Sequence, residues 1–245
     1  MAEELCIVFR NRTFGVEYAL EKIQAILTQQ QISTSGFELY DSPIELSQVA
    51  TRLKRSSRIT FHLRGQGFEF ILGSVANYKV DFLSIRSDIP IRIPWDTWAW
   101  QFIDSPNFVM AWVVDSEYDF WQNAEDLLHY TVHNRPYSHL PQKSNGLPFP
   151  VEQTIIDISR NPGRRLFRNG YYEIVAAHMW LGEPFWSLTG TSKAAVEQAD
   201  WLTVSYPLSN VLKVEAAPQC FTSDIEQEAD LQRRLRSLLF NTPGD

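Results

Sequence analysis

The stretch FVMAWVV, residues 108–114, is an unbroken apolar run that decides how the rest of the chain is interpreted. Pro106 and Asn107 stand before it and Asp115 follows it, so residues that favour turns bound it on both sides. A short run rich in β-branched and aromatic residues is typical of a strand buried on both faces. It predicts the central strand of a sheet.

Before this run, the chain alternates short apolar strands with amphipathic helices. Apolar residues at helical spacing predict a helix over residues 16–27. The sequence Ser42-Pro43-Ile44-Glu45 has the pattern of a capping box with proline at the first helical position, and it predicts the start of a second helix. Strands are expected at residues 5–9, 36–40 and 80–85, with a β-hairpin that turns at Gly65-Gln66-Gly67.

After the run, Asp115 or Ser116 is expected to cap one helix that extends through residues 121–128. Residues 134–150 hold four prolines and a glycine, which indicates a long irregular connection and the candidate boundary between two lobes. Ser223-Asp224-Ile225-Glu226 resembles a second capping box and predicts the start of the last helix. Further elements are expected at residues 154–158, 192–198, 201–205 and 211–214.

These elements define the expected fold class. Strands and helices are intermixed in both halves, but strict alternation holds only near the start of the chain. We therefore predict an α+β protein with a mixed sheet and flanking helices, formed by residues 1–245 as a single domain.

Composition and charge limit the classes of partner. The 245 residues are 44% hydrophobic and 21% charged, which is sufficient for an ordered core, and the formal net charge is -7. Such a charge repels phosphate backbones and anionic lipids, so we expect neither nucleic acid nor membrane as a partner. It attracts a basic protein. The acidic start and the lack of a long apolar run predict a cytoplasmic protein in which Cys6 and Cys220 stay reduced.

No catalytic, metal or cofactor signature is complete. His129 and His133 have the spacing of zinc ligands on a helix, and Glu125 or His139 would be a third ligand. Tyr130, however, stands where a zinc protease has glutamate, so two solvated histidines and no metal are expected. The glycines of the hairpin turn lack the third glycine of a dinucleotide site, and residues 189–193 fit a turn and helix cap better than a phosphate loop. We expect no cofactor.

Three groups of side chains are candidates for surfaces. The acidic group is predicted to bind a partner, because its charge has the same sign as the whole chain. The basic group is expected to be a solvated helix end, with phosphate binding as the alternative, and the aromatic group is expected to pack in the core, with the lining of a groove as the alternative. The members are Asp115, Glu117, Asp119, Glu125 and Asp126 (acidic); Arg52, Lys54, Arg55 and Arg58 (basic); and Trp95, Trp98, Trp100 and Phe102 (aromatic).

One part of the chain resembles a known family. The segments DISRNPGR (157–164), GY-x-E (170–173) and MWLG-x-x-FW (179–186) are similar to a group of α+β immunity proteins of bacterial polymorphic-toxin and type VI secretion systems. Members of that group occur beside toxins with a restriction-endonuclease-like nuclease domain. The similarity covers residues 154–190.

The resemblance implies a cytosolic protein that is not an enzyme and that binds one cognate toxin tightly. It also implies roles for individual residues. Pro162, Gly163, Trp180, Gly182 and Trp186 are expected to be structural. Arg164, Glu173 and His178 are the polar members expected to line a pocket.

Two other functions remain open on the sequence alone. The first is a small hydrolase-like enzyme, whose pocket would gather Glu173, His178, Asp157 and Arg164. The second is a regulatory module that binds a small metabolite.

Overall fold

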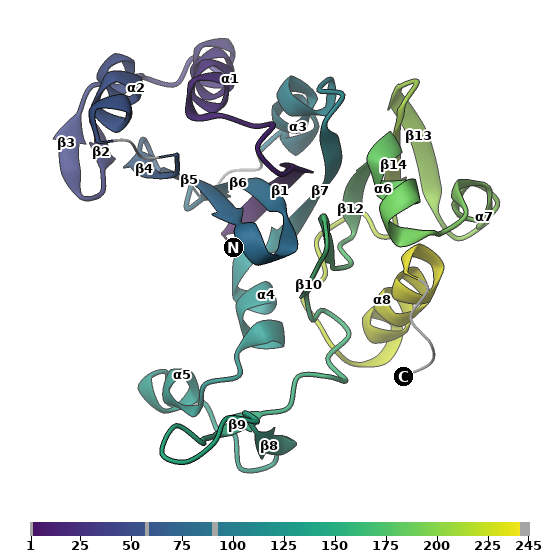
Figure 1. Ribbon diagram of the computed structural model, residues 1–245. Coiled ribbons are helices and arrows are strands. Elements are labelled where there is room, and N and C mark those ends of the chain that lie inside the picture. The colour runs from purple at the N-terminus through teal and green to yellow at the C-terminus, as the bar shows by residue number, and fades with distance from the viewer. Residues whose placement is uncertain (1, 57–58, 90–92, 241–245) are drawn as a thin grey trace.

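A computed structural model describes residues 2–56, 59–89 and 93–240, and a ten-stranded sheet dominates it (Figure 1). In the order in which they pair, its strands are β13 (Thr203–Leu208), β14 (Val211–Glu215), β12 (His178–Gly182), β7 (Phe108–Asp115), β1 (Glu3–Arg10), β6 (Val80–Ser87), β5 (Phe68–Val75), β4 (Phe61–Gly65), β2 (Phe37–Leu39) and β3 (Ser42–Ile44). A short 3-10 turn, η1 (Ala76–Tyr78), connects β5 to β6. The α+β class is confirmed. The ladders between these strands are antiparallel, where a mixed sheet was expected.

The predicted central strand is confirmed as β7, which lies between β1 and β12. Every residue of β7 is buried, because helices cover both faces of the sheet at this point. The predicted hairpin is also confirmed: Gln66 and Gly67 both have positive φ, which is the backbone of the tight turn that joins β4 to β5. Burial on both faces therefore identifies β7 as a strand in the middle of the sheet.

Three helices cover one face of the sheet: α1 (Val16–Gln29), α2 (Leu46–Arg55) and α3 (Trp95–Ile103). The predicted first helix is confirmed as α1, whose apolar stripe packs on the sheet. Trp95, Trp98 and Phe102 lie on the buried side of α3, which confirms their place in the core, but Trp100 is 47% exposed.

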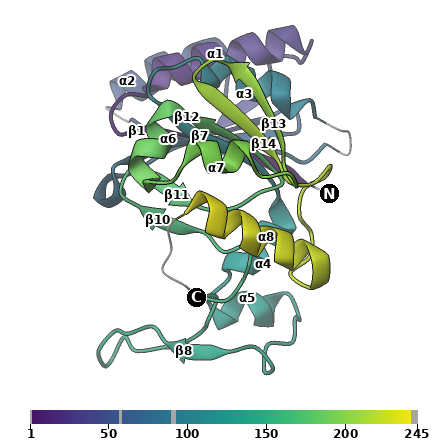
Figure 2. The ribbon, with the colours of Figure 1, turned by 90° about the vertical axis from the view of Figure 1, so that its right-hand side faces the viewer.

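The other face carries α6 (Glu183–Thr189), α7 (Lys193–Glu197) and α8 (Glu226–Leu239) (Figure 2). A separate two-stranded hairpin, β10 (Leu166–Arg168) and β11 (Tyr171–Glu173), lies on the same face. Ser192 caps α7 by accepting a hydrogen bond from the Ala195 N–H, as the sequence predicted. In both figures α8 lies below α6 and α7 and forms the lower end of this layer.

The segment 116–158, called the arm here, extends away from the sheet in Figures 1 and 2. It holds α4 (Ser116–Asn123), α5 (Leu127–Val132) and a small sheet of β8 (Gln142–Ser144) and β9 (Thr154–Ile156). One helix was predicted here, which is wrong: Ala124 has an extended backbone that ends α4, and Asp126 caps a new helix. The arm has its own small core of Ala124, Tyr130, Ile156 and Ile158.

The candidate lobe boundary, residues 134–150, lies within the arm. β7 comes before this connection and β12 comes after it, yet the two strands pair directly in the same sheet. Among the described residues, no helix is long and apolar enough to cross a bilayer.

Both predicted capping boxes are wrong. Ser42-Pro43-Ile44 is the edge strand β3, where proline is tolerated because the missing N–H would point away from the sheet. α8 begins at Glu226 with Ile225 at the N-cap, two residues later than predicted. There the Glu228 carboxylate accepts hydrogen bonds from the backbone N–H groups of Thr222 and Ser223, at 2.8 and 2.9 Å. The two short polar motifs therefore placed the starts of α2 and α8 only approximately.

Candidate functional site

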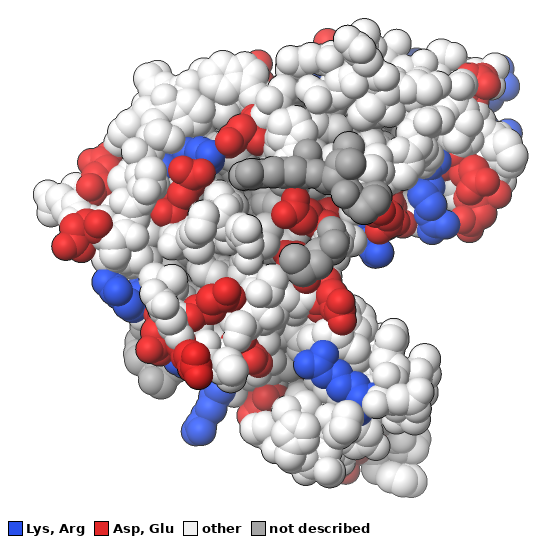
Figure 3. All heavy atoms as spheres, turned by 180° about the vertical axis from the view of Figure 1, so that it is seen from behind, with Lys and Arg blue, Asp and Glu red and all other residues white. Residues whose placement is uncertain are grey.

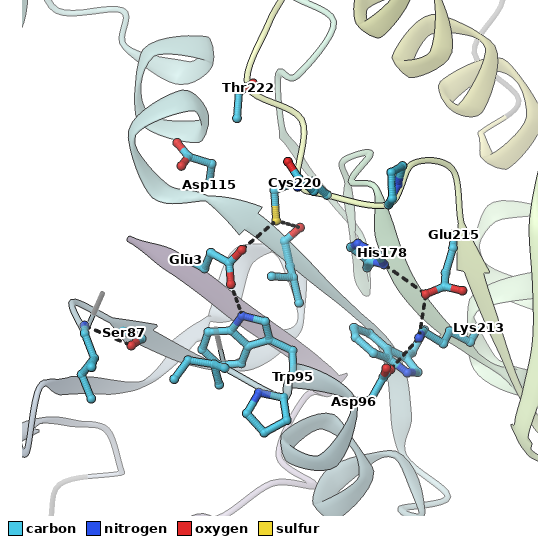
Figure 4. A pocket seen from close by; sticks show the side chains of 17 residues that line it. Glu3, Ser87, Trp95, Asp96, Asp115, His178, Lys213, Glu215, Cys220 and Thr222 are labelled. Carbon is cyan, nitrogen blue, oxygen red and sulfur yellow. Dashed lines mark hydrogen bonds and ion pairs between the residues drawn. The ribbon is translucent and has the colours of Figure 1, made fainter. Parts of the chain in front are cut away.

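A cavity of about 450 Å³ lies at one end of the large sheet, on the face covered by α3. Antiparallel neighbours reverse direction, so strands that begin here alternate with strands that end here. Register places Glu3 opposite both Ser87 and Asp115, and it places His178 opposite Glu215. All five side chains therefore point to the same face and form the floor of what we call the sheet-end cavity (Figure 4).

The first turn of α3 and the chain after β14 form the walls of the cavity. Trp95 Nε1 donates a hydrogen bond to Glu3 Oε2 at 2.6 Å, and Cys220 Sγ lies 3.8 Å from Glu3 Oε1 (Figure 4). Burial, together with the nearby Glu3 carboxylate, raises the pKa of Cys220 to about 12. The thiol therefore stays protonated at neutral pH and lacks the thiolate character of a nucleophile.

A network of ion pairs crosses the floor of the sheet-end cavity. Lys213 Nζ lies 2.7 Å from Asp96 Oδ1 and 2.9 Å from Glu215 Oε1, and His178 Nδ1 lies 3.3 Å from the same Glu215 oxygen. Burial acts to lower the pKa of Lys213, but Asp96 and Glu215 outweigh it and the net shift is upward. Burial likewise acts to raise the pKa of Glu215, and Lys213 and His178 reverse that effect. These charges stabilise one another.

The residues of the predicted polar pocket do not come together. His178 lines the sheet-end cavity, but Glu173 lies with the core on the opposite face of the sheet. Asp157 is in the arm, where its carboxylate is 2.9 Å from Lys143 Nζ, and this contact and the hydrogen bonds with Ser159 lower its pKa to about 2. The pocket proposed for a hydrolase is therefore wrong, because β11 and β12 carry Glu173 and His178 into different layers.

Glu173 instead belongs to a buried network with Arg236 that sequence analysis missed. Arg236 Nη1 lies 2.9 Å from Glu173 Oε1, and Arg236 Nη2 donates to the carbonyl oxygens of Pro162 and Arg164. The Pro162–Arg164 turn is thus fastened to the last helix. Arg236 follows Gln232 by four residues on the buried stripe of α8, and this spacing was the signal available.

The five acidic residues predicted to bind a partner do not form one exposed surface. Asp115 is 5% exposed and caps α4, accepting from Tyr118 N at 2.8 Å. Asp119 is 6% exposed and pairs with Arg165 at 3.0 Å. Glu117 and Asp126 are exposed and Glu125 is partly exposed, so only these three are placed to meet a partner.

The motif residues expected to be structural lie in the interior. Trp180 packs in the core on the α1–α3 face, and Trp186 packs on the opposite face. Pro162 and Gly163 are buried next to α4 and α8. Gly182 passes so close to the Phe108 carbonyl oxygen that no side chain fits there, which explains glycine at this position.

The remaining sequence candidates lie on the surface. His129 and His133 are exposed and lie against the Phe120 ring, with ring centroids 5.1 and 6.1 Å away. Within residues 2–56, 59–89 and 93–240, no group of three or more potential ligands is placed to hold a metal ion. The basic residues Arg52, Lys54 and Arg55 form the last turn of α2, and Arg58 lies outside the described residues.

The chain resembles a solved structure although its sequence shows no relationship. No protein-family model matches it, and no curated protein matches it in sequence. The fold is similar to that of the Pseudomonas aeruginosa T6SS protein PA0821, with a TM-score of 0.51 and 8% sequence identity. The match covers 98% of this chain and 73% of that one. At this identity the similarity establishes the fold alone.

Proposed function

We propose that this protein is an immunity protein that binds one secreted toxin and blocks its active surface. The observation that carries the proposal is the fold similarity over 98% of the chain to a protein named for a type VI secretion system. The motif at residues 154–190 independently resembles immunity proteins of such systems. The toxin would be a basic nuclease domain met in the cytosol.

The contacts of the polar motif residues support a binding role. His178 pairs with Glu215, Glu173 pairs with two arginines, and Asp157 pairs with Lys143. Each of these side chains therefore stabilises the fold through an ion pair, as expected of a protein that presents a preformed binding surface. A rigid surface loses little conformational entropy when it binds, and this favours tight complexes.

Protection of cells is the direct test. The toxin domain encoded beside this gene should kill cells when expressed alone and should be harmless when this protein is co-expressed. The two purified proteins should also form a complex of defined stoichiometry. If the adjacent toxin kills equally well with and without this protein, and no complex forms, the proposed function is wrong.

The sheet-end cavity favours a second function, the binding of a small metabolite. Its walls include Trp95 and Trp180, and four carboxylates face one lysine and one histidine. Aromatic rings and excess carboxylate together recognise cationic groups. A panel of amines and basic amino acids should then raise the melting temperature of the wild type and leave that of Glu3→Gln unchanged. If no compound raises the melting temperature of the wild type, the binding of amines and basic amino acids is excluded as a function of this cavity.

A further inference from the structure

The loop that connects β8 to β9, residues 145–153, presents three apolar side chains to solvent. Leu147, Phe149 and Val151 are 51%, 90% and 53% exposed. They alternate with Pro148 and Pro150, so the sequence of the loop tip is LPFPV. Single exposed apolar residues are common on protein surfaces, but three within five residues at the end of an extended arm form a feature that needs an explanation.

The loop has a fixed conformation, and Asn145 holds it. The Asn145 side-chain oxygen accepts hydrogen bonds from the N–H groups of Leu147 and Gln153, at 3.1 and 3.2 Å. Its side-chain nitrogen donates to the Val151 carbonyl oxygen at 3.1 Å. The two prolines restrict the backbone further. An ordered loop that keeps apolar side chains in water is prepared for binding, because little conformational entropy is lost when they are buried.

The three apolar side chains take no part in the core of the arm. That core is formed by Ala124, Tyr130, Ile156 and Ile158, with partly buried residues packed around it. Folding of the arm therefore does not explain why the loop tip is apolar. Burying Phe149 against another molecule would remove the side chain from water, and aromatic side chains of this kind supply much of the affinity at protein interfaces.

Charge identifies the class of partner. The arm carries six acidic residues against two basic ones, so it holds more than half of the net charge of -7. Two copies of the arm repel each other, and nucleic acid or an anionic membrane is repelled as well. A basic protein is attracted. Figure 3 shows the arm (lower right) from behind: its visible surface is largely uncharged, and acidic residues gather at the inner end of the notch that separates it from the α1–α3 side.

We propose that loop 145–153 is the part of this protein that inserts into the basic toxin domain, with Phe149 as its central contact. The proposal rests on the proposed immunity function and assigns the surface that carries it out. Exposed acidic residues of the arm attract the toxin, and the apolar loop tip then becomes buried against it. Asn145 is a positioning residue that keeps the tip ready to bind.

The experiment compares Phe149→Ala and Leu147→Ser with the matched variant Ile59→Ser. Ile59 is 76% exposed and lies next to β4, away from the arm. Binding to an inactivated form of the adjacent toxin domain is measured by biolayer interferometry. Each loop variant should raise Kd at least about tenfold, mainly through faster dissociation, and Ile59→Ser should stay within about twofold of the wild type. All three variants should keep the wild-type melting temperature.

Hydrogen exchange in the complex and self-association of the wild type are two further measurements that distinguish the outcomes. Hydrogen exchange at the Leu147 and Val151 amides should slow in the complex. If the wild type binds the toxin but the loop variants bind equally well, the loop assignment is wrong and the immunity function stands. If the wild type does not bind, both proposals are wrong. Self-association of the wild type that Phe149→Ala abolishes would identify a second copy as the occupant and overturn the assignment.

Discussion

Glu173 and Arg236 are the most deeply buried ion pair among the described residues, with side chains 2% and 5% exposed. Removing one partner of such a pair leaves the other charge buried without compensation. We expect Glu173→Ala to lower the free energy of unfolding by about 3–5 kcal/mol, measured by urea denaturation. Arg233→Ala, one turn earlier on α8 and exposed, should change it by less than about 0.5 kcal/mol. Equal effects of the two variants would contradict a structural role for the buried pair.

Asp119 makes stability depend on pH. Burial raises its pKa to about 6, against an ordinary value of 3.8, and Arg165 only partly opposes this. The folded state therefore binds a proton more readily than the unfolded state, so Asp119 stabilises the fold increasingly as pH falls from about 6 to about 4. Relative to Asp119→Asn, the wild type should gain up to about 3 kcal/mol of unfolding free energy across that window. Denaturant titrations at a series of pH values check this, and parallel curves would show that the pKa is ordinary.

At the scale of single elements, β12 and α6 carry the aromatic anchors of the motif. Trp180 of β12 is 2% exposed and Trp186 of α6 is 9% exposed, on opposite faces of the sheet. Trp180→Ala and Trp186→Ala should each lower the free energy of unfolding by about 3–5 kcal/mol, because each leaves a large cavity. Trp100→Ala, at a 47% exposed position on α3, is the matched control and should cost far less. Unfolding curves like that of the wild type would show that the two anchors are dispensable.

Elements with a strong burial pattern were predictable from sequence, and elements defined by short polar signals were not. β7 and α1 were predicted because long apolar patterns reflect burial, which dominates folding. Ser42-Pro43-Ile44 was misassigned because the same residues suit a helix cap and an edge strand. α3 was missed as a helix although Trp95, Trp98 and Phe102 have helical spacing, because these aromatic residues were interpreted only as a group that packs in the core.

The candidate site was less predictable than the fold. Antiparallel register brings Glu3, Asp115, His178 and Glu215 to one end of the sheet from strands far apart in the chain. No local sequence pattern predicts which residues of these strands pair with one another. Glu173 and His178, in contrast, are close in sequence and suggested a common pocket, but the chain between them passes from one layer to another. Proximity in sequence was therefore misleading here.

At the scale of the whole molecule, the distribution of charge predicts how fast the proposed partner is met. Replacing Glu117, Glu125 and Asp126 by Lys should slow association with the toxin at least about tenfold and leave dissociation nearly unchanged. Added salt should slow association of the wild type in the same way, because it screens exposed charges.

Three exposed acidic residues outside the arm provide the control for that experiment. Glu17, Glu21 and Glu38 are exposed, and their replacement by Lys gives the same net charge as the arm variant. This control variant should slow association much less than the arm variant does if the acidic residues of the arm attract the toxin. Equal slowing would mean that the total charge alone decides the rate.

The position of β1 has a consequence for synthesis of the protein. β1 is synthesised before both of the strands that flank it in the sheet, β6 and β7, and Glu3 lies opposite Ser87 and Asp115. At about 5–20 residues per second, its second neighbour is made roughly 5–20 s later, so the apolar residues of β1 wait unpaired in the nascent chain. We expect the sheet to form only after β7 has emerged. Force measurements with arrested ribosomes should detect no folding tension at shorter chain lengths, and earlier tension would show that β1 finds a temporary partner.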